Sequence, residues 1–231
     1  MDSVAKPKTS KLLYVLIACV VAGSGILALV NETFNADPDP AATAPTAASS
    51  DAARTLDTLE VKGRSPKTGY DRTVQFGAAW TDVDRNGCDT RNDILARDLK
   101  NVTLSGDCKV MSGTLEDPFT GTTVDFVRGQ QSSSVVQIDH IVPLSDAWQK
   151  GAQQLSQDQR VAFANDPLNL QAVLGKANAQ KGDSDAATWL PDNRAFRCEY
   201  VSRQVTVKAN YKLWVTQAEK DAMVRVLRTC A

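Results

Sequence analysis

The stretch VVQIDHIVPLSDAWQKGAQQLSQDQRVAFANDPLNLQAVLGKANAQK, residues 135–181, determines the fold that this sequence predicts. Its β-branched first residues predict a short strand that ends at Asp139 and His140. Residues 168–173 predict a second short strand, and the Ala- and Lys-rich residues 175–181 predict a helix. The order is therefore strand, excursion, strand, helix, with Asp139 and His140 at the end of a strand.

The excursion between the two strands is predicted to be helical. Pro143 takes the chain out of the first strand because its ring fixes φ and it lacks a backbone N–H. Residues 145–151 and 156–164 then predict two short helices, the second with Ser156 as its N-cap. The Asn-Asp-Pro turn at 165–167 returns the chain to the second strand.

The rest of the chain adds both helices and strands to this centre. Residues 90–99 carry apolar side chains at helical spacing, whereas residues 121–127 alternate as a strand does. Residues 198–207 have strand character, and residues 216–227 predict an amphipathic helix that begins with a capping box. The sequence therefore predicts an α+β fold in which residues 55–231 form a single globular domain.

The N-terminal segment predicts export from the cytoplasm. Residues 12–30 contain 19 residues without a charge and follow three lysines, which is typical of a membrane-directed helix. Residues 1–34 are therefore either an uncleaved signal anchor or a signal peptide. Residues 35–54 are rich in Ala, Pro and Thr and predict a disordered linker. The domain is expected outside the cytoplasm, either secreted or anchored to the membrane through this segment.

Four cysteines lie in the predicted domain. An even number of cysteines in an oxidising compartment predicts two disulfides, and no pair has the C-x-x-C spacing of a zinc site. The pairing Cys88–Cys108 with Cys198–Cys230 gives the shortest loops, and the two other connectivities stay open.

Composition and charge exclude several classes of protein. The chain has 231 residues, of which 42% are hydrophobic and 23% are charged, too apolar for a disordered chain and too polar for a multi-pass membrane protein. The net charge is −1, and beyond residue 39 the chain carries 23 basic and 23 acidic residues. A polyanionic partner would therefore need a local binding site, since the domain as a whole does not attract it.

Chemistry-bearing residues gather around the predicted strands and helix. His140 is the only histidine of the chain, and Asp139 precedes it directly. Asn169 opens the second strand, and Asn178 lies nine residues later on the following helix, with Lys181 one turn further on. A single Asp-His pair is common, but the ordered set of residues is specific.

This ordered set resembles the HNH endonucleases, whose active site is a ββα-metal motif. The match is closest to a secreted actinobacterial branch that shares its domain with the C-terminal part of GmrSD-type restriction enzymes, and it extends from about residue 55 to the end. The resemblance implies an endonuclease that hydrolyses phosphodiester bonds of DNA, or of RNA, with little sequence specificity. It implies nucleic acid as the partner, and no protein partner is inferred.

The resemblance also implies roles for individual residues. His140 would be the general base that deprotonates water, since a neutral imidazole beside a hydrated cation suits this reaction. Asp139 and Asn178 offer hard oxygen ligands to one Mg²⁺ or Mn²⁺ ion. Many family members carry a second histidine at the position of Asn178, and an asparagine there favours these ions over zinc. Asn169 would hold the loop that presents the histidine.

Basic residues near the motif are candidates for binding phosphate. Each of them has an alternative interpretation as a solvated surface charge. The candidates are Lys181, Arg197, Arg203 and Lys208.

A second oxygen-rich segment resembles an EF-hand loop. Oxygen donors stand at positions 1, 3, 5, 9 and 12 of this pattern and a glycine stands at position 6. The donors are Asp82, Asp84, Asn86, Thr90 and Asp93. The pattern has Asp89 where an apolar residue is usual, and a short aspartate at position 12. The alternative interpretation is a turn held by a disulfide through Cys88.

Two hypotheses therefore remain. The first is an exported metal-dependent endonuclease. The second is a non-catalytic, disulfide-stapled surface module that binds calcium or another surface component. Nicking of plasmid DNA with and without EDTA separates them.

Overall fold

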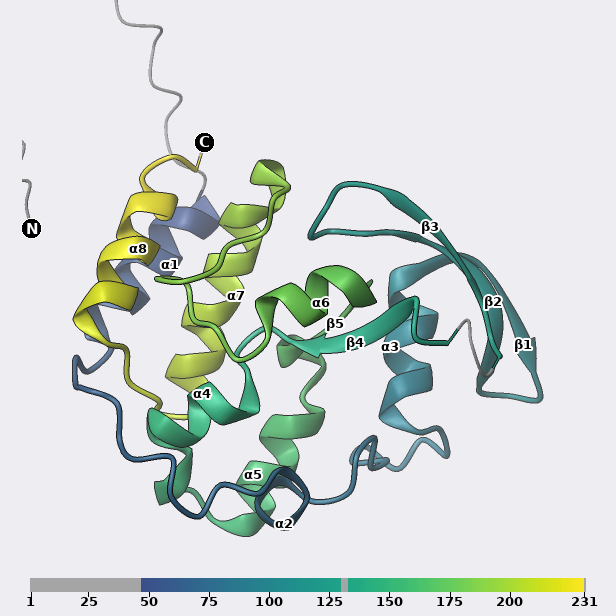
Figure 1. Ribbon diagram of the computed structural model, residues 1–231, viewed down its shortest axis with the longest axis horizontal. Helices are drawn as coiled ribbons and strands as arrows, with labels where there is room; N and C mark the ends of the chain where they lie inside the picture. The colour runs from purple at the N-terminus through teal and green to yellow at the C-terminus, as the bar shows by residue number, and fades with distance from the viewer. Residues whose placement is uncertain (1–46, 130–132, 231) are drawn as a thin grey trace, which may run out of the picture. The chain divides into compact units, whose positions relative to one another are not determined.

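The computed structural model describes residues 47–129 and 133–230, which form one compact unit of mixed helices and strands (Figure 1). The elements in chain order are α1 (Ala47–Thr58), α2 (Arg72–Phe76), α3 (Thr90–Asp98), β1 (Leu99–Ser105), β2 (Lys109–Glu116), β3 (Thr123–Val127), β4 (Val136–His140), α4 (Leu144–Gln149), α5 (Gln157–Asn165), β5 (Leu170–Leu174), α6 (Gly175–Lys181), α7 (Arg197–Asn210) and α8 (Gln217–Leu227). Short 3-10 turns cover Ala152–Gln154, Pro167–Asn169 and Arg194–Phe196. The α+β class is confirmed.

Two antiparallel sheets are formed. One has the strand order β1-β2-β3, and the other consists of β4 and β5 alone. In the small sheet His140 pairs with Leu170, and Asp139 pairs with Gln171. Helix α6 follows β5 directly, so the predicted order of strand, excursion, strand and helix is present. His140 is thereby fixed at the last position of β4.

Helix α3 joins the two sheets (Figure 1). Its Ile94 and Leu95 are fully buried and belong to a core cluster that also includes residues of both sheets, among them Phe126 from β3 and Ile138 from β4. A two-stranded sheet is at best marginally stable alone, so this packing supports the strand that carries His140.

The helices α1, α7 and α8 pack together on the other side of the small sheet (Figure 1). The prediction of a strand at residues 198–207 is wrong, because this segment lies inside α7. Its β-branched residues suggested a strand, but the buried positions Val201 and Val205 recur four residues apart, which is the period of a helix. Packing against α1 and α8 outweighs the weak local preference.

The predicted boundary of the linker also needs correction. The linker was expected to extend to residue 54, yet α1 begins at Ala47, and Ala52 and Leu56 are buried in the core. Alanine has the highest helix propensity, and an apolar face formed by a few residues is enough to dock the helix. The predicted segment at 1–34 and the earlier part of the linker lie outside the described residues. Among the described helices, none is long and apolar enough to cross a membrane.

Both disulfides of the shortest-loop pairing are present. Cys88 is bonded to Cys108, and Cys198 is bonded to Cys230. The first links the segment before α3 to the turn between β1 and β2, and the second links α7 to the segment after α8. The predicted disulfides are confirmed.

Candidate active site

A cavity of about 190 Å³ opens where β4 ends, between the start of α4 and helix α6. The sequence predicted three of its polar lining residues, namely Asp139, His140 and Asn178. Four further polar or charged lining residues were not predicted, and these are Tyr70, Arg72, Ser145 and Asp183. A smaller cavity of about 20 Å³, room for roughly one water molecule, shares Arg72 and His140 as lining residues.

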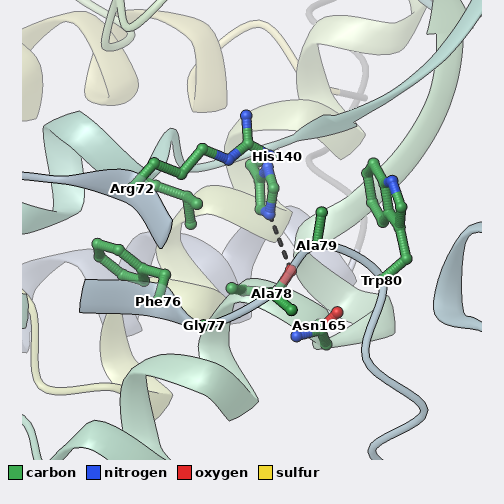
Figure 2. Close-up of a pocket in the computed structure, with 10 residues that line it drawn as sticks. Arg72, Phe76, Gly77, Ala78, Ala79, Trp80, His140 and Asn165 are labelled. Atoms are coloured by element: carbon green, nitrogen blue, oxygen red, sulfur yellow. Dashed lines mark hydrogen bonds between the residues drawn. The ribbon is translucent and has the colours of Figure 1, made fainter. Parts of the chain in front are cut away.

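The position of the proton on His140 follows from its hydrogen bond. Nε2 lies 2.8 Å from the carbonyl oxygen of Ala164 (Figure 2). Because a carbonyl can only accept, Nε2 carries the proton and Nδ1 keeps its lone pair. Burial lowers the pKa of His140 to about 3, and the positive charges of Arg72 and Lys181 contribute in the same direction. The imidazole is therefore neutral at physiological pH.

Asn169 holds the segment that follows His140. Its Oδ1 accepts a hydrogen bond from the backbone N–H of Val142 at 2.8 Å, and its Nδ2 donates to the carbonyl oxygens of Val142 and Phe163 at 3.3 and 3.4 Å. Its own carbonyl oxygen accepts from the N–H of Ile141 at 2.8 Å. Asn169 is completely buried and does not line the cavity, so its contacts are those expected of a loop clamp.

Asp139 is a buried carboxylate with one incompletely satisfied oxygen. Nζ of Lys181 lies 3.1 Å from Oδ1 and 3.0 Å from Oδ2, but Oδ2 receives no hydrogen bond of acceptable geometry from the described residues. Burial raises the pKa of Asp139, and the charge of Lys181 opposes this rise. Lys181 therefore helps to keep the carboxyl group ionised.

The donor set of the cavity fits a hard cation. Asn178 donates through Nδ2 to Oε1 of Gln137 at 2.8 Å, which leaves its Oδ1 as an oxygen donor in the cavity that Asp139 also lines. Within residues 47–129 and 133–230, no group of three or more His, Cys, Asp and Glu side chains could hold a metal ion. Two protein oxygens with water completing the shell suit Mg²⁺, which releases its water reluctantly.

Arg72 is a lining residue that the sequence did not single out. It comes from α2, is exposed, and forms no hydrogen bond or ion pair with other described residues. Its guanidinium lies beside His140 in Figure 2. No local signal marks this arginine, because only the fold brings α2 to the end of β4.

Asp183 and Ser145 form a second pair at the cavity. Oγ of Ser145 donates to Oδ2 of Asp183 at 2.9 Å, and Nζ of Lys67 lies 3.2 Å from the same oxygen. The hydrogen bond from Ser145 lowers the pKa of Asp183, and Lys67 adds to this effect. Asp183 is therefore an ionised carboxylate, although it was not predicted as a site residue.

The four predicted phosphate-binding residues do not line this cavity. Lys181 is 1% exposed, and its Nζ donates to the carboxylate of Asp139 and to the carbonyl oxygen of His140 at 2.8 Å. Arg203 donates to the carbonyl oxygens of Leu168 and Leu170, both at 2.9 Å. These interactions give Lys181 and Arg203 structural roles in place of phosphate contacts, and Arg197 lines a separate groove.

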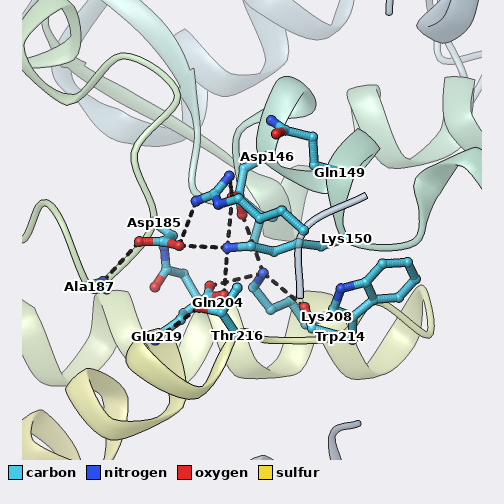
Figure 3. Close-up of polar contacts among 12 residues, drawn as sticks. Asp146, Gln149, Lys150, Asp185, Ala187, Gln204, Lys208, Trp214, Thr216 and Glu219 are labelled. Carbon is cyan, nitrogen blue, oxygen red and sulfur yellow. Dashed lines mark hydrogen bonds and ion pairs between the residues drawn. The ribbon is translucent and has the colours of Figure 1, made fainter. Parts of the chain in front are cut away.

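Lys208 belongs to a buried ion cluster (Figure 3). The cluster combines three cations and three carboxylates, and its members are Arg64, Asp146, Lys150, Asp185, Lys208 and Glu219. Nζ of Lys208 lies 3.0 Å from Oε1 of Glu219, so the prediction that Lys208 binds phosphate is wrong. Charged groups are buried only when they are paired, and pairing is visible only in the folded chain.

The cluster fixes α4 against α7, α8 and the segment after α6. Nζ of Lys150 lies between 2.6 and 2.7 Å from one oxygen of each of the three carboxylates. Burial acts to raise the pKa of Asp185, but the hydrogen bond and charge of Lys150 outweigh it and lower that pKa. Asp146 and Asp185 each stand within two residues of the cavity residues Ser145 and Asp183, so the cluster supports that wall.

The EF-hand-like segment is an exposed loop closed by its own hydrogen bonds. Nδ2 of Asn86 donates to Asp84 at 3.1 Å and to Asp93 at 3.2 Å, while the backbone N–H of Gly87 donates to Asp82 at 3.0 Å. The four predicted calcium ligands therefore lie close together, but the carboxylate oxygens that would bind calcium accept hydrogen bonds from N–H groups of the same loop. These bonds and the disulfide of the adjacent Cys88 are also those of a pinned turn, so calcium binding stays a prediction.

Residues 89–226 match the family described as GmrSD restriction endonucleases, C-terminal domain. An uncharacterized secreted protein of Arthroderma benhamiae is 38% identical over 201 residues, which cover 86% of this chain and 94% of that protein. No solved structure matches the chain significantly.

Proposed function

Because the chain belongs to the family of the C-terminal domain of GmrSD restriction endonucleases, we propose that it is a divalent-metal-dependent endonuclease of the HNH type. Its substrate would be DNA, or RNA, cleaved with low sequence specificity. The observation that carries the proposal is the single histidine, whose Nδ1 keeps its lone pair and which lines one cavity together with Asp139 and Asn178. The closer likeness to an actinobacterial branch stays a prediction.

His140 acts as the general base in this mechanism. Its Nδ1 takes a proton from the attacking water, while Nε2 keeps its hydrogen bond to Ala164 and holds the ring in place. The pKa of about 3 keeps Nδ1 unprotonated in the free protein. A phosphate bound beside the ring raises its proton affinity, because the negative charge stabilises the imidazolium.

Asp139 and Asn178 would hold one Mg²⁺ or Mn²⁺ ion through Oδ2 and Oδ1. The unsatisfied buried oxygen of Asp139 supports this assignment. When bound, the ion supplies positive charge that stabilises the leaving oxygen. Lys181 keeps Asp139 ionised, and Asn169 fixes the segment after His140 so that the base and the ligands keep their relative positions.

Arg72 binds the phosphate that is cleaved. Its guanidinium lines the same cavity and has no carboxylate partner among the described residues. The fork of N–H donors matches the oxygens of a phosphate group, and such charge-assisted hydrogen bonds are among the stronger ones in proteins. The negative charge of the substrate thus has a local partner in a domain of balanced charge.

The place of action would be outside the cytoplasm. Two disulfides and the similarity to a protein described as secreted support this location. The N-terminal segment would either be removed or anchor the domain to the membrane.

The test is nicking of supercoiled plasmid by the purified chain with Mg²⁺ or Mn²⁺, with EDTA, and with the variant His140→Ala. We expect nicking only by the unmodified chain with metal, because no other imidazole can serve as the base. Circular dichroism checks that the variant is folded. If His140→Ala keeps more than a tenth of the activity, His140 is not the base. If the unmodified chain never nicks but calcium raises its melting temperature, the non-catalytic surface module is the better description.

A further inference from the structure

A groove of about 500 Å³ lies between the segment that follows α6 and helix α8. Its ionisable lining residues are Arg194, Arg197 and Arg225, and no carboxylate lines it. The remaining lining consists of small or apolar side chains and one threonine. The groove is therefore purely cationic, although the domain as a whole has balanced charge.

None of the three arginines is neutralised within residues 47–129 and 133–230. Arg194 and Arg225 are exposed and form no ion pair there. Arg197 donates through Nε to the carbonyl oxygen of Pro191 at 2.7 Å, which leaves both terminal nitrogens of its guanidinium for another partner. By contrast, the cavity around Arg97 and Arg203 is also lined by three acidic residues.

The three arginines come from elements that are tied together covalently. Arg194 lies in a 3-10 turn, Arg197 is the first residue of α7, and Arg225 lies in α8. The disulfide between Cys198 and Cys230 links the residue after Arg197 to the end of the chain just beyond α8. The walls of the groove are thereby held at a fixed separation, which lowers the entropic cost of binding.

We propose that this groove binds the phosphodiester backbone of a nucleic acid, at a place separate from the His140 cavity. The two cavities share no lining residue. Guanidinium groups match phosphate oxygens in geometry and charge, and several of them in one groove suit a polymer with repeated phosphates. The identification of the polyanion as a nucleic acid rests on the proposed function. Arg197 is then a substrate-binding residue after all, but outside the catalytic cavity.

The experiment measures binding in the absence of cleavage. The chain with His140→Ala is titrated against a fluorescent duplex in Mg²⁺, at several salt concentrations, with and without Arg194→Gln and Arg225→Gln. A matched control removes two exposed arginines outside the groove, Arg54→Gln and Arg228→Gln, and so changes the net charge equally. Thermal unfolding checks that all variants are folded.

We expect the groove variant to bind the duplex at least roughly tenfold more weakly near 0.1 M salt. The negative slope of log K against log salt should become shallower by about 1.8, because each lost phosphate contact removes about 0.9 from its magnitude. The control should change the affinity less than twofold. Equal affinities of the groove variant and the control overturn the proposal. Vesicles of phosphatidylglycerol that bind with the same dependence on the two arginines overturn the assignment to nucleic acid. Because binding is measured without cleavage, a chain that binds through the groove but never nicks refutes the nuclease and keeps the groove.

Discussion

Replacing Lys150 by methionine tests whether the buried ion cluster acts as one electrostatic unit. The ammonium group of Lys150 is completely buried and lies 2.7 Å from Asp146, 2.7 Å from Asp185 and 2.6 Å from Glu219. Methionine has a similar length and volume but no charge, so it leaves three carboxylates with only two cations. Removing one partner of a buried ion pair costs about 3–5 kcal/mol, because the remaining charge stays buried without compensation.

This loss is a large share of the 5–15 kcal/mol that stabilises a typical domain. The loss of unfolding free energy is measured by urea unfolding at neutral pH with both disulfides intact. The same m-value, the dependence of the unfolding free energy on urea concentration, is used for variant and parent. The control is Lys100→Met. Lys100 pairs with Glu116 on the surface, where the two side chains are 63% and 64% exposed, and such a pair contributes at most about 1 kcal/mol.

The pH dependence separates electrostatics from packing. At acid pH one of the three carboxyl groups of the cluster takes up a proton in the Lys150→Met variant, so the difference from the parent should shrink. A loss below 1 kcal/mol at neutral pH would refute the reasoning, and a large loss that does not change on acidification would assign the effect to packing alone.

Four further predictions follow from the site and its surroundings. Asn178→Ala should raise the Mg²⁺ or Mn²⁺ concentration for half-maximal nicking at least tenfold, and an unchanged metal titration would place the ion elsewhere. Arg72→Gln should lower the nicking rate at saturating metal at least tenfold without changing the unfolding midpoint, since Arg72 is exposed and unpaired within the described chain. Reduction should lower the melting temperature markedly, because the disulfides close loops with separations of 20 and 32 residues and contribute about 3 kcal/mol each; an equal melting temperature with and without reductant would contradict this. The lowered pKa of Asp185 means that its contribution to stability is present above the unfolded-state value near 4 and is lost as the pH falls further, so the urea midpoint of the parent should depend on pH more steeply below pH 4 than that of Asp185→Asn.

The part of the fold that sequence could predict is the part set by local patterns. The strands β4 and β5 and helix α6 follow from a β-branched run, a turn and a helix-forming segment that are close in sequence. The same reasoning failed at α7, where β-branched residues are numerous and only the packing against α1 and α8 selects the helix. The strands β1 and β2 were not predicted either, since their pairing is partly irregular and their alternation is weak.

The candidate site divides in the same way. Asp139, His140 and Asn178 lie in one segment, and all three line one cavity. Arg72 reaches the cavity from a segment that carries no motif, and Asp183, two residues beyond α6, was not predicted as a site residue. The interpretation of Lys181 and Lys208 as phosphate ligands assumed that both lysines are exposed, as most lysines are. In the fold both are buried and paired with carboxylates, and this pairing depends on residues that are distant in sequence.

The hydrogen bond between His140 and the main chain has a consequence for how this site tolerates mutation. Every amino acid supplies a backbone carbonyl, so no substitution of Ala164 can delete the acceptor that keeps the proton on Nε2. A side chain that oriented the histidine could be lost through one substitution, whereas the backbone carbonyl of residue 164 is kept in every substitution. The arrangement depends instead on the number of residues between the two strands, since an insertion there would bring a different carbonyl beneath the ring. The hydrogen bond that keeps the proton on Nε2 should therefore survive replacement of the Ala164 side chain, but not a change in the length of the segment from β4 to β5.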